Sequence, residues 1–255
     1  MLWVGRKPDC GMGFIILSYR NIRRYCLVSK ICPNDRGSRI ASLVKKNPKN
    51  PWFDHYAERA KKEGYPARSV YKLEEIHKRF RLFRQEMSVL DLGCAPGSWL
   101  LYAARQVGGK GRAVGLDRNP VAIALPKNAR SMAVDIFELS EHDRELLGGG
   151  YDVVLSDMAP DTTGFRDVDA IRSAALCEAA LNLACEVLKP GGGFVCKIFQ
   201  GEGFDAFFRL VKNRFSGARL FKPEACRKES REIYIIASGK KSDVKTSGAE
   251  KPQNQ

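Results

Sequence analysis

The chain contains 255 residues, of which 44% are apolar, so it can bury the core of one domain of ordinary size. Lys and Arg outnumber Asp and Glu by 43 to 29. The net charge of +14 favours a polyanionic partner such as RNA, with a merely soluble basic surface as the alternative. No apolar run approaches the roughly 18 residues of a membrane-spanning helix. The eight cysteines include no CxxC pair, which disfavours a zinc site or a disulfide framework.

Residues 1–44 form a basic extension that differs from the rest of the chain. Residues 1–50 contain eleven Lys or Arg and only two acidic residues, Asp9 and Asp35. The apolar stretch Gly13–Leu17 is too short for a secretory signal, which leaves a mitochondrial presequence or a mis-assigned start as alternatives. We therefore expect a folded domain over 45–239 and a disordered polar tail over 240–255.

From about residue 51, apolar residues at helical spacing and short apolar runs predict alternating helices and strands. In chain order, the predicted elements are helices over 51–62 and 70–80, a strand over 88–92, a helix over 98–107, strands over 112–117, 131–134 and 151–156, a helix over 168–188, a strand over 193–199, a helix over 204–215, and strands over 218–221 and 232–237. This alternation predicts an α/β fold, a mostly parallel seven-stranded sheet with helices on both faces.

The first predicted strand leads into a glycine turn that can hold a ligand, Asp91-Leu-Gly-Cys-Ala-Pro-Gly97. In open α/β sheets, ligands bind beyond the carboxyl ends of the strands, and Gly93 and Gly97 let a ligand approach the backbone closely. The turn matches neither GxGxxG nor a P-loop, which disfavours a diphosphate ligand. An ordinary tight turn is the alternative interpretation.

Two acidic residues follow the next two strands at matching positions. Asp117 ends the second strand, where a carboxylate can accept both hydroxyl hydrogens of an adenosine ribose. Asp135 follows the third strand, within reach of an adenine edge. Either residue alone is more often a solvated loop acid. Together with the glycine turn they describe an adenosine pocket without phosphates, which indicates S-adenosylmethionine rather than NAD.

The fourth strand ends in Ser156-Asp-Met-Ala-Pro160, and this turn bears on the atom that is methylated. Enzymes that methylate exocyclic base nitrogens usually place Asn/Asp-Pro-Pro-aromatic here, whereas Met158 follows Asp157 in this chain and no aromatic residue follows the proline. The cysteine nucleophile of carbon-5 methylation is also absent from the turn. An oxygen is therefore the favoured acceptor.

Two charged residues lie in the closing strands. Lys197 stands within the apolar run Gly193–Phe199, where an unpaired lysine is costly to bury, and a lysine that reaches solvent from the strand end is the alternative. Glu232 shares a strand face with Tyr234 and Ile236, and its alternative is an exposed strand acid.

Several motifs, in this order and spacing, resemble the FtsJ/RrmJ family of ribose 2′-O-methyltransferases over about residues 51–239. They are Ala67–Ile76, Asp91–Trp99, Ser156–Pro160, Lys197–Gly201 and Ser230–Tyr234. The resemblance implies a Rossmann-like, S-adenosylmethionine-dependent methyltransferase fold. It places the family's catalytic tetrad on Lys72, Asp157, Lys197 and Glu232, with Lys197 as the candidate base. It places the family's cofactor contacts on Gly97, Trp99, Asp117, Asp135 and Asp157.

The resemblance also implies a substrate, a ribose of a uridine in large-subunit ribosomal RNA, methylated on the assembled or nearly assembled subunit. It implies a cytoplasmic monomer that needs no metal and no membrane, with the mitochondrial matrix as the alternative if residues 1–44 are a presequence. Basic residues of the N-terminal helices are expected to contact RNA phosphates, or else to form a solvated helix face. They are Arg59, Lys61, Lys62, Arg68, Lys78, Arg79, Arg81 and Arg84.

Some features of the sequence leave other interpretations open. Cys94 and Ser98 stand where the family usually has Ala and Gly, and Ser98 can alter how the turn wraps the cofactor. A nicotinamide dehydrogenase is opposed by the missing GxGxxG motif. An RNA-assembly factor without catalysis is opposed by the complete tetrad.

Overall fold

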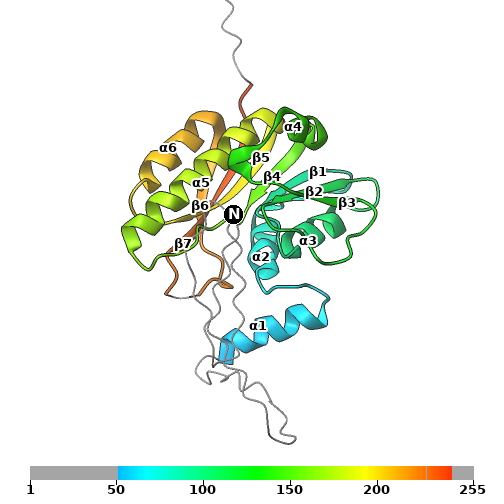
Figure 1. Ribbon diagram of the computed structural model, residues 1–255, viewed down its shortest axis with the longest axis horizontal. Helices are drawn as coiled ribbons and strands as arrows, with labels where there is room; N and C mark the ends of the chain where they lie inside the picture. Colours follow the sequence, from blue (N-terminus) through cyan, green and yellow to red (C-terminus); the bar gives the residue numbers. More distant parts are fainter. Residues whose placement is uncertain (1–50, 228, 243–255) are drawn as a thin grey trace, which may run out of the picture. The chain divides into compact units, whose positions relative to one another are not determined.

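The structure, a computed structural model, describes residues 51–227 and 229–242 (Figure 1). The basic extension 1–44 and most of the predicted tail lie outside the described residues, so the expectations about them stay predictions. Within the described part, no helix combines the length and the apolar character that crossing a membrane requires.

Seven strands form one sheet in the order β3-β2-β1-β4-β5-β7-β6, which confirms the predicted fold class. The strands are β1 (Ser88–Leu92), β2 (Arg112–Asp117), β3 (Ala129–Ala133), β4 (Tyr151–Ser156), β5 (Leu188–Phe199), β6 (Phe215–Phe221) and β7 (Glu232–Lys240). β1 to β5 pair in parallel, whereas β7 is antiparallel to both β5 and β6. The carboxyl ends of β1 to β5 therefore meet the first residue of β7 at one edge of the sheet.

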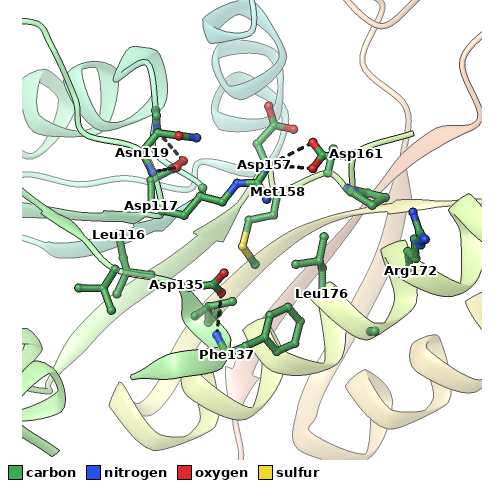
Figure 2. A pocket seen from close by; sticks show the side chains of 18 residues that line it. Leu116, Asp117, Asn119, Asp135, Phe137, Asp157, Met158, Asp161, Arg172 and Leu176 are labelled. Carbon is green, nitrogen blue, oxygen red and sulfur yellow. Dashed lines mark hydrogen bonds and ion pairs between the residues drawn. The ribbon is translucent and has the colours of Figure 1, made fainter. Parts of the chain in front are cut away.

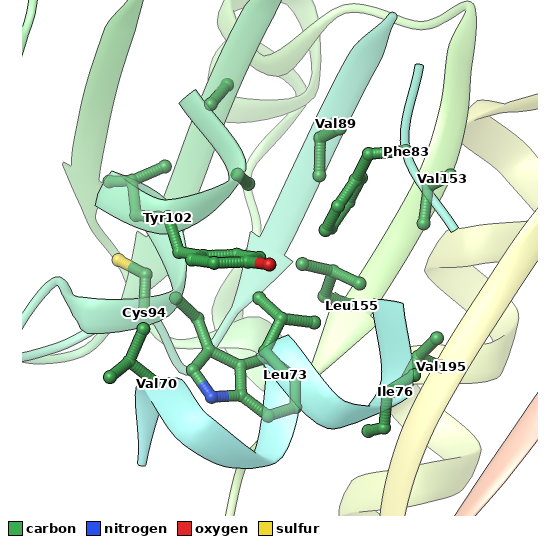
Figure 3. Close-up of a cluster of buried hydrophobic side chains, with 14 of the residues drawn as sticks. Val70, Leu73, Ile76, Phe83, Val89, Cys94, Tyr102, Val153, Leu155 and Val195 are labelled. Carbon is green, nitrogen blue, oxygen red and sulfur yellow. The ribbon is translucent and has the colours of Figure 1, made fainter. Parts of the chain in front are cut away.

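Helices cover both faces of the sheet, and each face has its own apolar core (Figure 1). The helices are α1 (Pro51–Lys62), α2 (Val70–Phe80), α3 (Ser98–Val107), α4 (Glu141–Leu147), α5 (Arg166–Val187) and α6 (Phe204–Arg214), with a short 3₁₀ helix η1 (Ile136–Glu138). On one face, side chains of α2 and α3 such as Leu73 and Tyr102 pack with Val89 and Leu155 of the sheet (Figure 3). On the other face, α5 and α6 pack against β4, β5 and β7.

The structure differs from the predicted elements in a few places. α4 and η1 were not predicted, because α4 has only seven residues and buries only Leu147, so it carries no apolar stripe. β3 begins at Ala129, two residues earlier than predicted. β7 continues to Lys240 instead of ending at Ala237, because Lys240 pairs with Phe215 of β6 and its amine donates to the Leu188 carbonyl, 3.3 Å away.

Candidate active site

A pocket of about 530 Å³ opens at the carboxyl edge of the sheet, beyond β1, β2, β3 and β4 (Figure 2). Its walls are largely apolar and include Leu116, Ile136, Met158 and Leu176, and the Met158 side chain extends toward Asp135 and Phe137. Carboxylates from three different strand ends also line it: Asp117, Asp135 and Asp157. An apolar slot with a few convergent polar groups is the usual form of a small-molecule site.

Asp117 is held by the backbone on both sides. One carboxylate oxygen accepts the N–H of Ala95 in the glycine turn, 2.9 Å away, and the other accepts the N–H of Asn119 at 2.8 Å. The carboxylate is partly exposed in the pocket (Figure 2). It therefore ties the turn after β1 to the end of β2, a structural role that the sequence does not reveal.

Asp135 precedes η1 and caps it. Its side chain accepts the backbone N–H of Phe137 at 3.0 Å, which fixes the short helix against the pocket (Figure 2). The Phe137 ring is 60% exposed and lines the pocket beside Ile136. This wall can take one face of a planar ring.

Gly97 and Trp99 lie at the start of α3 and do not line the pocket. Gly97 has φ +110°, and a Cβ there would lie 2.8 Å from the Ile123 Cδ1 atom, so the position requires glycine. The Trp99 indole is buried and donates to the Ser69 carbonyl at 2.8 Å. Ser98 links the same turn to the segment before α2, since its hydroxyl accepts the Ala67 N–H at 2.8 Å. The direct cofactor contacts of Gly97 and Trp99 stay predictions.

Lys197 and Asp157 form a nearly buried ion pair beside the pocket. The amine lies 3.0 Å from an Asp157 carboxylate oxygen and also donates to the Asp157 backbone carbonyl. The two residues share a face because each follows a core residue of that face, Leu155 and Val195, by two positions along neighbouring strands. Only 7% of the Lys197 side chain is exposed. The charged amine can therefore be buried because it is paired with Asp157, not because it reaches solvent.

Lys72 and Glu232 form the second pair, 2.9 Å between amine and carboxylate. Burial lowers the pKa of Lys72, but the charges of Asp157 and Glu232 outweigh burial, and the pKa lies above its ordinary value. Burial raises the pKa of Asp157, whereas Lys197, Lys72 and a hydroxyl hydrogen bond lower it, and the net shift is downward. The four residues of the expected tetrad thus form one electrostatically coupled cluster.

Tyr234 completes the cluster, although the sequence only places it on the face of Glu232. Its hydroxyl donates to the Asp157 carboxylate at 2.7 Å, and it stands opposite Lys197 in the β5–β7 register. Burial, together with the nearby carboxylates, raises the pKa of Tyr234 well above its ordinary value, so it stays a donor. Asp157 belongs to both the pocket and this cluster and is the residue that joins them.

An exposed ion pair, which sequence reasoning missed, spans two loops that line the pocket. Arg118, just after β2, donates to both carboxylate oxygens of Asp161, at 3.0 and 3.1 Å, in the loop after β4 (Figure 2). Both side chains are more than half exposed. The two loops therefore meet above the pocket floor.

Several basic residues of the N-terminal helices are paired with acids. Arg59 contacts Glu63 at 2.7 Å, and Lys78 contacts Glu74 at 2.7 Å. Lys62 likewise lies 3.0 Å from Glu58. These pairs favour the solvated helix face as the interpretation for these three residues. Their predicted contact with RNA is not tested by the structure.

Among the described residues, no group of three or more His, Cys, Asp or Glu side chains is arranged to hold a metal ion.

The fold and the pocket are those of a methyltransferase: a parallel sheet with a reversed β7, a glycine turn after β1, and carboxylates after β2 and β3. The family of FtsJ-like methyltransferases matches residues 65–240, and the chain belongs to this family. The family implies a methyl donor of the S-adenosylmethionine type.

Curated relatives cover most of the chain. Ribosomal RNA large subunit methyltransferase E of Desulforapulum autotrophicum is 59% identical over 77% of this chain and 97% of that protein. The protein of the same name from Desulfatibacillum aliphaticivorans is 57% identical over 77% of this chain and 95% of that protein. A crystal structure described as a ribosomal RNA methyltransferase from Plasmodium falciparum has a TM-score of 0.62 at 22% identity. It covers 70% of this chain and 100% of that one, and supports the fold.

Proposed function

We propose that this enzyme transfers the methyl group of S-adenosylmethionine to a ribose 2′-hydroxyl of large-subunit ribosomal RNA. The observation that carries the proposal is the position of Asp157. This residue lines the pocket at the carboxyl ends of the strands and also pairs with Lys197 of the buried cluster. A methyl donor in the pocket and an acceptor beside the cluster would therefore meet at this residue.

The pocket suits S-adenosylmethionine in size and in polar groups. Asp117 is proposed to accept the ribose hydroxyls, and Asp135 to face the adenine edge between Ile136 and Phe137. Gly97 and Trp99 are proposed to contact the cofactor from the start of α3 through their backbone, because the indole is buried elsewhere. When bound, the cofactor supplies a methyl group on a positively charged sulfur.

A ribose hydroxyl is a weak nucleophile at neutral pH, and the cluster supplies the nearby base that can take its proton. Lys197, in its unprotonated form, is proposed to take the 2′-hydroxyl proton as the hydroxyl oxygen attacks. Lys72 stays protonated because its pKa is raised, and it is proposed to orient the hydroxyl or a flanking phosphate. Asp157 and Glu232 hold the two amines in place. Alignment of this kind can supply about 7–11 kcal/mol in favourable cases.

The names of the curated relatives support ribosomal RNA of the large subunit as the substrate. We propose a uridine ribose in the assembled or nearly assembled subunit as the acceptor, and a monomer as the working form. The bacterial sources of these relatives support a cytoplasmic location over a mitochondrial one.

The test is methyl transfer to purified large subunits from a strain that lacks the enzyme. Labelled S-adenosylmethionine and the purified protein should place one 2′-O-methyl group per subunit, mapped by primer extension at low nucleotide concentration. Subunits from the parent strain serve as the control and should accept none, because their site is already occupied. Label on a base, or no transfer to either substrate, contradicts the proposal.

A further inference from the structure

An aromatic side chain stands out in solvent at the start of α5. Phe165 is 74% exposed, more than any other large apolar side chain among the described residues, and Val168 in the next turn is 40% exposed. Exposed aromatic rings on a basic RNA-binding protein are the platforms on which unstacked nucleobases bind.

The backbone around Phe165 is fixed. The buried Asp169 carboxylate accepts the Thr163 N–H at 2.8 Å, the Thr163 hydroxyl at 2.9 Å and the Gly164 N–H at 3.3 Å. Phe165 itself donates its N–H to the Thr163 hydroxyl at 3.2 Å, and its carbonyl accepts the Asp169 N–H at 3.0 Å. The ring is therefore presented on an ordered turn, which lowers the entropy cost of stacking.

Phe165 also lies at the start of a helix that contributes to the candidate active site. Val168, Arg172 and Ala175 recur at i, i+4 and i+7, so they share one face of α5, and the last two line the pocket. Phe165 directly precedes the helix, three residues before Val168. The neighbouring Arg166 carbonyl accepts the guanidinium of Arg231 at 3.0 Å, and Arg231 directly precedes Glu232 of the cluster.

We propose that Phe165, flanked by Val168, stacks on a nucleobase of the RNA substrate next to the ribose that is methylated. The inference rests on the proposed function and names one contact that positions its substrate. Arg166, next to Phe165, and Arg172, which lines the pocket, are both exposed and provide charge complementarity for the phosphates of that nucleotide.

The experiment compares Phe165→Ala, Phe165→Leu and Phe165→Tyr with the wild type in methyl transfer to undermethylated large subunits. Phe165→Ala should raise the KM for subunits by about 5- to 150-fold, the range for losing one base–aromatic stack. Its kcat and its affinity for S-adenosylmethionine should stay within about twofold. Phe165→Tyr should restore the wild-type KM, and Phe165→Leu should behave like Phe165→Ala.

The matched control is Leu146→Ala, which removes a 46% exposed apolar side chain from the end of α4. The loop after α4 leads into the amino end of β4, whereas the candidate active site lies at the carboxyl ends of the strands. It should leave the KM unchanged. An unchanged KM for Phe165→Ala overturns the inference. A wild-type KM for both Phe165→Leu and Phe165→Tyr also overturns it, because an apolar contact with a protein, without stacking, would then suffice. If the wild type transfers no methyl group to subunits, the proposed function itself fails.

Discussion

The pocket and the charged cluster meet at Asp157 but are built in different ways. In the pocket, Asp117 and Asp135 bind backbone amides close to them in the chain or in the neighbouring turn, and they stay partly exposed. In the cluster, Lys72 and Glu232 are 160 residues apart and both are nearly buried. The pocket is thus shaped by local turns. The cluster instead depends on the packing of α2 in one core with β5 and β7. Substitutions should separate the two regions by what they change, cofactor affinity or turnover.

The largest effect should come from Lys197→Ala in the cluster. Losing the base should lower single-turnover methyl transfer by about 10²- to 10⁴-fold, the range for general acid–base catalysis. Affinity for S-adenosylmethionine, measured by calorimetry on the same protein, should change little, because the proposed adenosine contacts lie on β1 to β3. Lys197→Arg should not restore transfer, because a guanidinium stays protonated.

Two results of the Lys197→Ala substitution would contradict this division between a pocket that sets cofactor affinity and a cluster that sets turnover. Near-wild-type transfer by Lys197→Ala would move the role of base to another residue, first of all Lys72. An equal loss of turnover and of cofactor affinity would mean that removing the partner of Asp157 disturbs the pocket as well.

Asp117→Ala should give the opposite result, a loss of cofactor affinity of about 1.5–3 kcal/mol, because hydrogen bonds to a charged group are lost. Saturating S-adenosylmethionine should recover most of the single-turnover rate, which it cannot do for Lys197→Ala. Asp117→Asn keeps one acceptor for the Ala95 amide and should fall between wild type and alanine. Unchanged affinity in calorimetry would remove Asp117 from the pocket's binding groups.

Arg118→Ala should have a smaller effect. The Arg118–Asp161 pair is exposed, so its contribution to the free energy of unfolding should be about 0.2–1 kcal/mol and should fall with added salt. Because the pair joins two loops of the pocket, cofactor association and dissociation rates in stopped flow should change by a few-fold. Lys110→Ala breaks the exposed Lys110–Glu86 pair and should change stability alone. Identical cofactor-binding rates for Arg118→Ala and Lys110→Ala would show that the Arg118–Asp161 pair does not contribute to cofactor binding.

Removing residues 1–44 should have the smallest effect, because the extension belongs to neither region in the predicted domain division. A chain that starts at Lys45 should keep the thermal stability, the cofactor affinity and the single-turnover rate of the full chain. Loss of folding would contradict this division. A weaker KM for subunits that depends steeply on salt would identify the extension as a basic RNA-binding arm.

The sequence predicts the sheet and the cluster well for related reasons. Runs such as Val153–Leu155 can only be buried, and the period of two along a strand carries Asp157, Lys197 and Glu232 to the same face. It is the family motifs, however, that join these three residues with Lys72 as a tetrad, and no pattern of the residues alone connects Lys72 to Glu232. Local polar turns are harder to predict. The bond from Asp117 to Ala95, the Arg118–Asp161 pair and the short polar helix α4 depend on backbone geometry that leaves no periodic signal.

Asp91, the first residue of the glycine-turn motif, has a consequence for stability. Its carboxyl group is fully buried, and neither oxygen has a hydrogen-bond partner among the described residues. Burial, and then the charges of Asp157 and Asp117, raise its pKa well above the ordinary value. In the unfolded chain the carboxyl ionises at about pH 4, so the free energy of unfolding falls as the pH rises from there toward the folded-state pKa. This carboxyl therefore makes the protein less stable at neutral pH than in mild acid, and the acid at the start of the cofactor turn is kept at the expense of stability.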